Sequence, residues 1–111
     1  MTADQILSHH LGAFGNNDLD EIMKDYTEES IVFAETGVVS GISAIREFFI
    51  VMFRMIPSGS EFKMKQMNVV LNVAQIIWSS KSSAAEIPYG SDTFVFEKDK
   101  IKFHTVSIYL K

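Results

Sequence analysis

The sequence predicts an α+β domain in which three N-terminal helices pack on one side of a strongly curved, mainly antiparallel sheet. Three observations favour this class. Apolar residues recur at helical spacing in three segments before Gly59, the alternation typical of strands replaces that spacing after it, and polar breaks separate the later runs. Helices followed by a series of neighbouring antiparallel strands are typical of α+β folds.

Composition sets the size and class of the molecule. The chain has 111 residues, 47% of them hydrophobic, so we expect a single domain over residues 1–111 with one core. Its formal net charge is −4 and its basic residues are scattered, which argues against nucleic acid or an anionic membrane as a partner. It contains no cysteine, which excludes disulfides and thiolate metal sites. No signal peptide or membrane span is recognisable, so we expect a cytoplasmic protein.

Two helices are expected first. Thr2 and Gln5 have the spacing of a capping box, and the helix that follows carries His10 and Phe14 on its apolar face. Asp18 has the character of a second cap, before a narrow apolar stripe that reaches Tyr26. The polar Gly-Asn-Asn segment between the two helices indicates a hairpin.

The third helix, over Ser40–Ile56, has the clearest pattern. At about 100° per residue its main apolar residues fall within an arc of about 160°, and Pro57 ends the helix. Ile50 and Val51 are apolar on the opposite side, so we expect a second element to cover that flank too. The residues of the main arc are Ile42, Ile45, Phe48, Phe49, Met52, Phe53, Met55 and Ile56.

Strands are predicted from β-branched and aromatic content. A strand over residues 30–35 and a short partner at Val38–Val39 precede the third helix. The four long strands that follow are separated by breaks that suit antiparallel hairpins. These strands are Phe62–Leu71, Val73–Ser80, Ala84–Phe96 and Lys100–Leu110.

Two of the long strands have an ambiguous phase. Phe62 and Met64 define an inward face, and continuing their alternation turns Gln66 inward as well. Either a bulge resets the phase near Gln66, or the inner face becomes polar there because it lines a cavity. In the last strand, Ile101 and Val106 fall on opposite phases. A bent sheet wrapped on helices leaves a conical hollow, and we expect the functional site in that hollow.

Three segments resemble signature regions of the nuclear transport factor 2-like superfamily. They are NNDLDEIMKDYTEESIVF (Asn16–Phe33), SGISAIREFF (Ser40–Phe49) and SDTFVFEKDKI (Ser91–Ile101). This superfamily includes ketosteroid isomerase, SnoaL-type polyketide cyclases, limonene epoxide hydrolase and scytalone dehydratase. The resemblance implies the cystatin-like cone, with three N-terminal helices on a strongly curved mixed sheet. It speaks to the fold more than to the reaction, because the superfamily holds both enzymes and non-catalytic binding or assembly modules.

The resemblance is nearest to bacterial ketosteroid isomerase and implies three catalytic candidates. Asp92 matches that enzyme's neutral aspartic acid in the segment DTFVF, and His10 aligns with its oxyanion-hole tyrosine. Its general base aligns with Ala34, and the neighbouring Glu35 reaches the hollow only if the strand is bulged or the alignment shifts by one residue. Two arrangements stay open. His10 and Asp92 form an ion pair, or a neutral His10 and a protonated Asp92 both donate to a ligand oxygen.

We expect further residues to line the hollow as ligand contacts: Phe14, Phe49, Phe53, Met64, Gln66, Trp78, Tyr89 and Phe94. No phosphate-binding loop, dinucleotide fingerprint or paired metal-ligand motif occurs, so no cofactor and no metal are expected. The outer face of the sheet, which would carry Ile77 and Val95, is apolar enough that we expect a homodimer through it.

The expected ligand is a small hydrophobic molecule, and three functions follow from it. The first is cofactor-free acid/base chemistry of the isomerase, cyclase or dehydratase type, with His10, Asp92 and Glu35 as catalytic residues. The second is a module that holds the ligand without transforming it. The third is an assembly module whose hollow is filled by core side chains. An enzyme needs a group with perturbed titration in the hollow, and a binding module needs only room.

Overall fold

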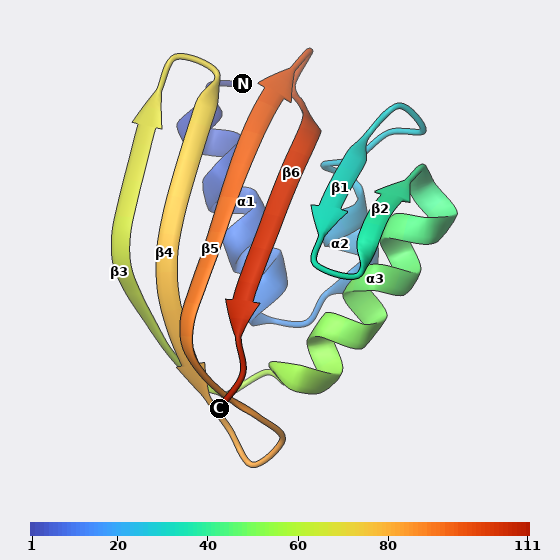
Figure 1. The fold of residues 1–111 in the computed structure, drawn as a ribbon. Coiled ribbons are helices and arrows are strands. Elements are labelled where there is room, and N and C mark those ends of the chain that lie inside the picture. The colour runs from blue at the N-terminus through green and yellow to red at the C-terminus, as the bar shows by residue number, and fades with distance from the viewer.

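The computed structural model describes residues 1–111, with helices packed against one side of a curved six-stranded sheet (Figure 1). The α+β class and the mixed, mainly antiparallel sheet predicted from the sequence are confirmed. The strand order is β2-β1-β6-β5-β4-β3, with β1 parallel to β6 and the other neighbours antiparallel. The elements are α1 (Ala3–Gly15), α2 (Leu19–Met23), β1 (Ile31–Ala34), β2 (Gly37–Ser40), α3 (Ile42–Met55), β3 (Glu61–Val70), β4 (Val73–Lys81), β5 (Glu86–Glu97) and β6 (Lys100–Tyr109).

Local hydrogen bonds explain where the helices begin. In α1 the Gln5 N–H donates to the Thr2 hydroxyl at 3.2 Å, and the Thr2 N–H donates to the Gln5 side chain at 2.8 Å, so the capping box is confirmed. Helix α2 begins after the Asp18 cap but has only five residues, so it stops short of Tyr26. The first N–H of α3, at Ile42, donates to the carboxylate of Glu28 at 2.9 Å. None of the helices is long and apolar enough to cross a membrane.

Helix α3 is buried along one flank and partly open along the other, where Ile50 is half-buried. Its residues Ile45, Phe49 and Met52 are buried, as the main apolar arc predicted. The expectation that a second element covers the opposite flank is wrong for Val51, whose side chain is 51% exposed. The uncovered flank leaves apolar surface beside the β1–β2 hairpin.

Two β-bulges resolve the ambiguous strand phases. In β3 the register shifts between Met64 and Gln66, so the bulge alternative is confirmed, and Gln66 pairs with Ile77 on the outer face. In β6 the register shifts around Lys102, because Ile101 pairs with Phe96 and Phe103 pairs with Val95. This second bulge turns both Ile101 and His104 inward, and both are buried. The two apparent phases of the last strand are therefore one continuous inner face.

Gly90 makes room on that inner face for the largest side chain of β4. Gly90 pairs directly with Trp78, and a Cβ atom on Gly90 would lie 2.3 Å from Cε2 of the Trp78 ring. The indole therefore lies flat across the strand that carries Asp92. Only glycine at this position lets a ring of that size lie so close to the neighbouring backbone.

We expect Gly90→Ala to lower the free energy of unfolding by about 1–3 kcal/mol, because the added methyl group overpacks the Trp78 ring. Gly12→Ala is the matched control, since nothing lies within 4 Å of its added Cβ in the exposed part of α1. That control should raise stability by up to about 1 kcal/mol through helix propensity. Urea denaturation measures both. A Gly90→Ala protein as stable as the unmodified one would show that the ring relaxes without cost.

Candidate functional site

A chain of hydrogen bonds between buried side chains crosses the inner face of the sheet. Tyr26, just after α2, contacts Nδ1 of His104 on β6 through its hydroxyl at 2.9 Å. The other ring nitrogen of His104 lies 2.7 Å from Oδ2 of Asp92 on β5. Trp78 on β4 donates its indole N–H to Oδ1 of Asp92 at 2.8 Å. All four residues are buried, so the chain links three strands to the end of α2 away from water.

The partners available to each group assign the protons in this chain. Burial, and next the charge of Asp92, raise the pKa of Tyr26 well above its usual value, so the phenol keeps its proton. Its only partner is His104 Nδ1, so the phenol O–H donates to that nitrogen, and the Nε2–H of His104 is then directed at Asp92. Asp92 accepts from His104 and from Trp78. Both oxygens of Asp92 therefore have a partner within the protein, whereas one of the two expected arrangements directs this carboxyl at a ligand.

His10 lies beside this chain but takes no part in it. Its ring packs edge-on against Phe94 at 5.0 Å and His104 at 5.7 Å between ring centroids, and its Nδ1 is enclosed without a hydrogen-bond partner. Burial, followed by the neighbouring histidines, lowers the pKa of His10 well below 6.5, so the ring is neutral. The expected ion pair between His10 and Asp92 is absent.

The unpartnered Nδ1 also indicates which tautomer His10 adopts. A buried N–H without an acceptor is rarer than a buried acceptor without a donor, so the proton is best placed on Nε2. Nε2 is not enclosed in the same way, and His10 borders a small cavity. His10 can therefore present one hydrogen-bond donor to that cavity.

The inner cavity at the centre of the cone is too small for a substrate. Its volume is about 30 Å³, which is room for water but not for an organic ligand. The expected hollow is thus almost filled, chiefly by aromatic side chains from α1 and α3. The lining residues are His10, Leu11, Phe14, Phe48, Phe49, Met52, Phe62, Ile76, Trp78, Asp92, His104 and Val106.

Five of the predicted site residues meet at this cavity. Phe14, Phe49 and Trp78 line it together with His10 and Asp92. They come from α1, α3 and two strands, as the predicted cone requires. The sequence therefore identified residues on both the helix side and the sheet side of the cavity, but it did not indicate how small the cavity is.

The other predicted ligand contacts lie elsewhere. Phe53 packs on Phe14 at 5.3 Å between ring centroids, and Phe94 stacks on His104 at 4.2 Å, so both belong to the packed core. Met64, Gln66 and Tyr89 line neither this cavity nor the larger space described next, and all three are exposed. The expected place of Gln66 and Tyr89 in the hollow is wrong, because both point to the outer face. Met64 pairs with Trp78 on the inner face, as expected, but it is exposed on the edge strand β3 and does not reach the cavity.

A second and much larger space opens beside the inner cavity. We call it the groove: it has a volume of about 880 Å³ and lies between α3, the β1–β2 hairpin and the end of β6. Glu35, the third catalytic candidate, is at its edge, where its Oε1 accepts the Ile108 N–H at 2.6 Å. The lining residues are Ala34, Glu35, Thr36, Val38, Val39, Ala44, Glu47, Phe48, Val51, Met52, Met55, Val106, Ile108 and Leu110.

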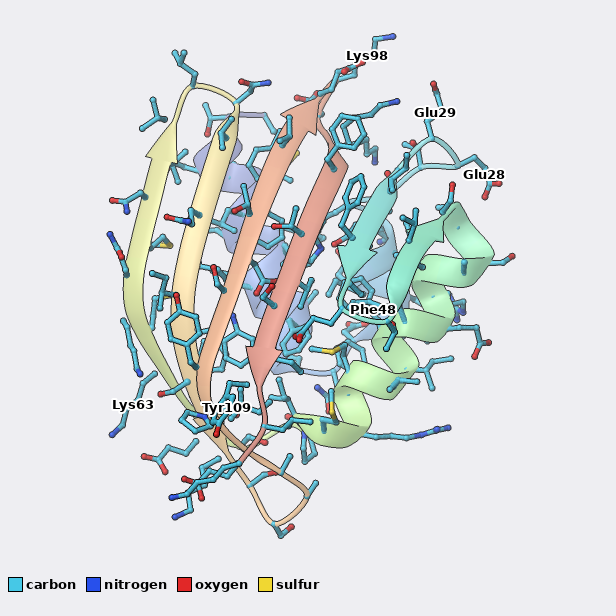
Figure 2. The ribbon with its side chains drawn as sticks, viewed as in Figure 1. Glu28, Glu29, Phe48, Lys63, Lys98 and Tyr109 are labelled. Carbon is cyan, nitrogen blue, oxygen red and sulfur yellow. The ribbon has the colours of Figure 1, made fainter.

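A thin wall separates the groove from the inner cavity. Phe48, Met52 and Val106 line both spaces, so one layer of side chains stands between Glu35 and His10. Figure 2 shows Phe48 on α3, next to the turn of the β1–β2 hairpin. The structure therefore brings His10 and Asp92 to one space and Glu35 to another.

Sequence analysis missed two members of the buried chain and the groove itself. His104 could have been found from the change of phase in the last strand, because a bulge between Ile101 and Val106 turns it inward. Tyr26 was assigned only to an apolar stripe, and nothing in its spacing indicates a partner on β6. The sequence signal for the groove was the apolar second flank of α3, because Val51 on that flank lines the groove.

A further histidine cluster lies at the surface, near the start of the buried chain. His9 on α1 contacts Asp25 through Nδ1 at 2.8 Å and Glu21 through Nε2 at 2.7 Å. The hydrogen bonds to Glu21 and then Asp25 raise the pKa of His9, whereas burial raises the pKa of Asp25 despite its contact with His9. The cluster joins α1 to α2. No group of three or more His, Asp or Glu side chains is placed to hold a metal ion.

Comparison with solved structures identifies the fold. An NTF2-like protein of unknown function from Cytophaga hutchinsonii matches with a TM-score of 0.77 at 16% identity, over 98% of this chain and 91% of that one. A protein of unknown function with a cystatin-like fold from Methylobium petroleophilum matches with a TM-score of 0.74 at 11% identity, over 96% and 74%. The predicted nuclear transport factor 2-like, cystatin-like fold is confirmed.

A third similar structure belongs to a protein with a provisionally assigned enzymatic activity. It is a protein from Shewanella denitrificans, provisionally assigned as a SnoaL-like polyketide cyclase, with a TM-score of 0.77 at 14% identity over 96% of this chain and 90% of that one. No protein-family model matches the chain, and no curated protein sequence matches it. At such identities the likeness shows a shared fold and no particular activity.

We expect the contribution of His9 to stability to fall as the pH rises. The folded-state pKa of His9 is raised above 6.5, so its stabilising effect is full below that value and is lost as the pH passes the raised pKa. The difference in unfolding free energy between the unmodified protein and His9→Gln should be larger at about pH 6 than at about pH 9. Urea denaturation at both values measures it. Taking the difference removes the pH dependence that the two proteins share, and a pH-independent difference would contradict the prediction.

Proposed function

We propose that this protein binds a small, largely apolar molecule in the groove and does not transform it. The observation that carries the proposal is the size and chemistry of the groove. Its volume of about 880 Å³ lies within the usual range of ligand sites, and 11 of its 14 lining residues are hydrophobic. Val38, Val51 and Leu110 in its wall are each more than half exposed, and such a contiguous apolar surface marks an interaction site.

The comparisons support a small organic ligand without specifying it. The Shewanella protein of the same fold is provisionally assigned to polyketide cyclisation, a reaction on a small organic molecule. The groove opens at the rim of the same conical architecture. A ligand there needs no change in the packed core.

Cofactor-free acid/base chemistry is the second candidate function. The observation that favours it is the position of His10 at the inner cavity. The His10 ring borders the inner cavity, where its Nε2 can offer a ligand one hydrogen-bond donor. A ligand would have to displace Phe48 or Met52 to reach it. Each oxygen of Asp92 already accepts one hydrogen bond from the protein, and Glu35 lies outside the wall. The binding function therefore stands first.

We also propose a homodimer through the outer face of the sheet. Ile77 and Val95 lie on that face with Phe33 and Phe103, whose rings are 6.3 Å apart across β1 and β6. Phe33 and Phe103 are 42% and 36% exposed, which is a large apolar surface for a monomer. A two-fold axis would bring the same face of two copies together.

We expect Val51→Asp to weaken binding of N-phenylnaphthylamine, an uncharged apolar fluorescent probe, by at least about tenfold. The reason is that the probe would cover the new carboxylate, and an ion resists transfer out of water. Val70→Asp is the matched control, because Val70 is exposed on β3 outside the groove. Fluorescence titration measures both variants. An unchanged affinity in Val51→Asp would exclude the groove as the site.

His10→Leu extends the same titration to the second candidate. A probe that stays in the groove should bind this variant with unchanged affinity, because the wall of Phe48 and Met52 separates them. A loss of affinity would instead place the probe in an opened inner cavity and favour acid/base chemistry. Circular dichroism confirms that the variant is folded.

We expect sedimentation of the unmodified protein at micromolar concentration to give a dimer, and Phe103→Lys to give a monomer, because two added cations would face each other across the axis. Met67→Lys is the control, since Met67 is also exposed but lies on the inner face of β3, opposite the buried Ile76. A monomeric unmodified protein would rule out the dimer.

A further inference from the structure

We propose that the groove selects an apolar molecule that carries a cationic amine, which names the ligand class and rests on the binding function proposed above. Only two of the residues that line the groove are charged, and both are carboxylates, Glu35 and Glu47. No lysine, arginine or histidine lines it. A ligand in the groove therefore meets apolar walls, one threonine and negative charge, and no positive charge.

Glu35 is held at the groove rather than free in solvent. Its Oε1 accepts the backbone N–H of Ile108 at 2.6 Å, and Ile108 itself lines the groove. The second carboxylate oxygen of Glu35 makes no hydrogen bond within the protein, so it is available to a ligand. A fixed acceptor with a free oxygen is suited to an ammonium group, which has only donors to offer.

No cation of the protein neutralises these two carboxylates. Neither Glu35 nor Glu47 forms a salt bridge, whereas eight of the other twelve acidic residues lie within salt-bridge distance of a basic group. Arg46, which precedes Glu47 on α3, is turned away and donates to Asp20 at 2.8 Å. The formal net charge of −4 has the same sign as the groove. An anionic ligand would thus be repelled both locally and by the whole molecule.

The size of the effect follows from the exposure of the two carboxylates. Both are exposed, so solvent screens them, and a charge placed about 4 Å away gains or loses about tenfold in affinity rather than many powers of ten. Contact with the apolar walls accounts for most of the binding affinity, and the two carboxylates determine which head group is preferred. Added salt should reduce the preference, since the charges are near the surface.

Three ligands of equal chain length test the head group. Decylamine, decanol and decanoate are titrated, below their aggregation concentrations, against the full chain loaded with N-phenylnaphthylamine. Decylamine is protonated near neutral pH like a lysine side chain, and it should displace the probe at about tenfold lower concentration than decanol. Decanoate should need about tenfold more than decanol. Higher ionic strength should bring the three closer together.

The double variant Glu35→Gln, Glu47→Gln assigns the preference to these residues. It should bind the three ligands with nearly equal affinity, and the amide oxygen that replaces the Glu35 carboxylate can still accept the Ile108 N–H. Glu97→Gln is the matched control, because it also removes an exposed carboxylate but lies at the β5–β6 turn, away from the end of β6 that borders the groove (Figure 1). The control should keep the full preference.

The outcomes separate this inference from the binding function itself. If decanol displaces the probe and decylamine does no better, or decanoate does best, the head-group proposal is overturned while binding stands. A preference that survives in the double variant also overturns it. If neither the probe nor any of the three ligands binds, the binding function fails and the head-group proposal falls with it.

Discussion

The hydrogen-bond chain from Tyr26 through His104 and Asp92 to Trp78 is the interaction on which the rest of the structure depends. It joins the end of α2 to β6, β5 and β4 by one side chain each, so it holds the inner face of the sheet against the helices. Each of these buried polar groups would cost about 1–3 kcal/mol if left unpaired. Because they satisfy one another, aromatic side chains can close around them, and Gly90 leaves the space in which the Trp78 ring lies.

That closure explains why the molecule has a filled centre and an open rim. The rings of Phe14 and Phe49 meet over the chain at 6.3 Å between centroids, and only about 30 Å³ remains between them and Asp92. Further along α3, Val51 faces no strand and stays exposed. The same helix therefore seals the inner cavity with one flank and forms the floor of the groove with the other. Most of the open volume therefore lies in the groove and not in the inner cavity.

Much of the fold could be predicted from the sequence, because its signals are local. The capping box at Thr2, the apolar arc of α3 and the polar breaks between strands each depend on residues close in the chain. The bulges in β3 and β6 are harder to predict, because they show in the sequence only as a change of hydrophobic phase, which a polar inner face would also produce. Each bulge reverses the face of every residue beyond it. That reversal explains why Gln66 was expected inside and His104 was overlooked. The free volume also escaped prediction, because it depends on how side chains from distant elements pack together.

The wall formed by Phe48, Met52 and Val106 favours ligand binding in the groove over acid/base catalysis as the function of this protein. Opening it exposes a phenylalanine side chain, whose burial is worth about 1.5–3 kcal/mol, and a ligand recovers this only by filling the same space. Beyond the wall it would find one donor on the neutral His10 and an Asp92 whose two oxygens each already accept a hydrogen bond. Proton abstraction needs a group that is placed to take a proton from the ligand. Glu35, the nearest candidate base, is on the other side of the wall, so the groove can hold a ligand as it stands, whereas catalysis would require the core to rearrange first.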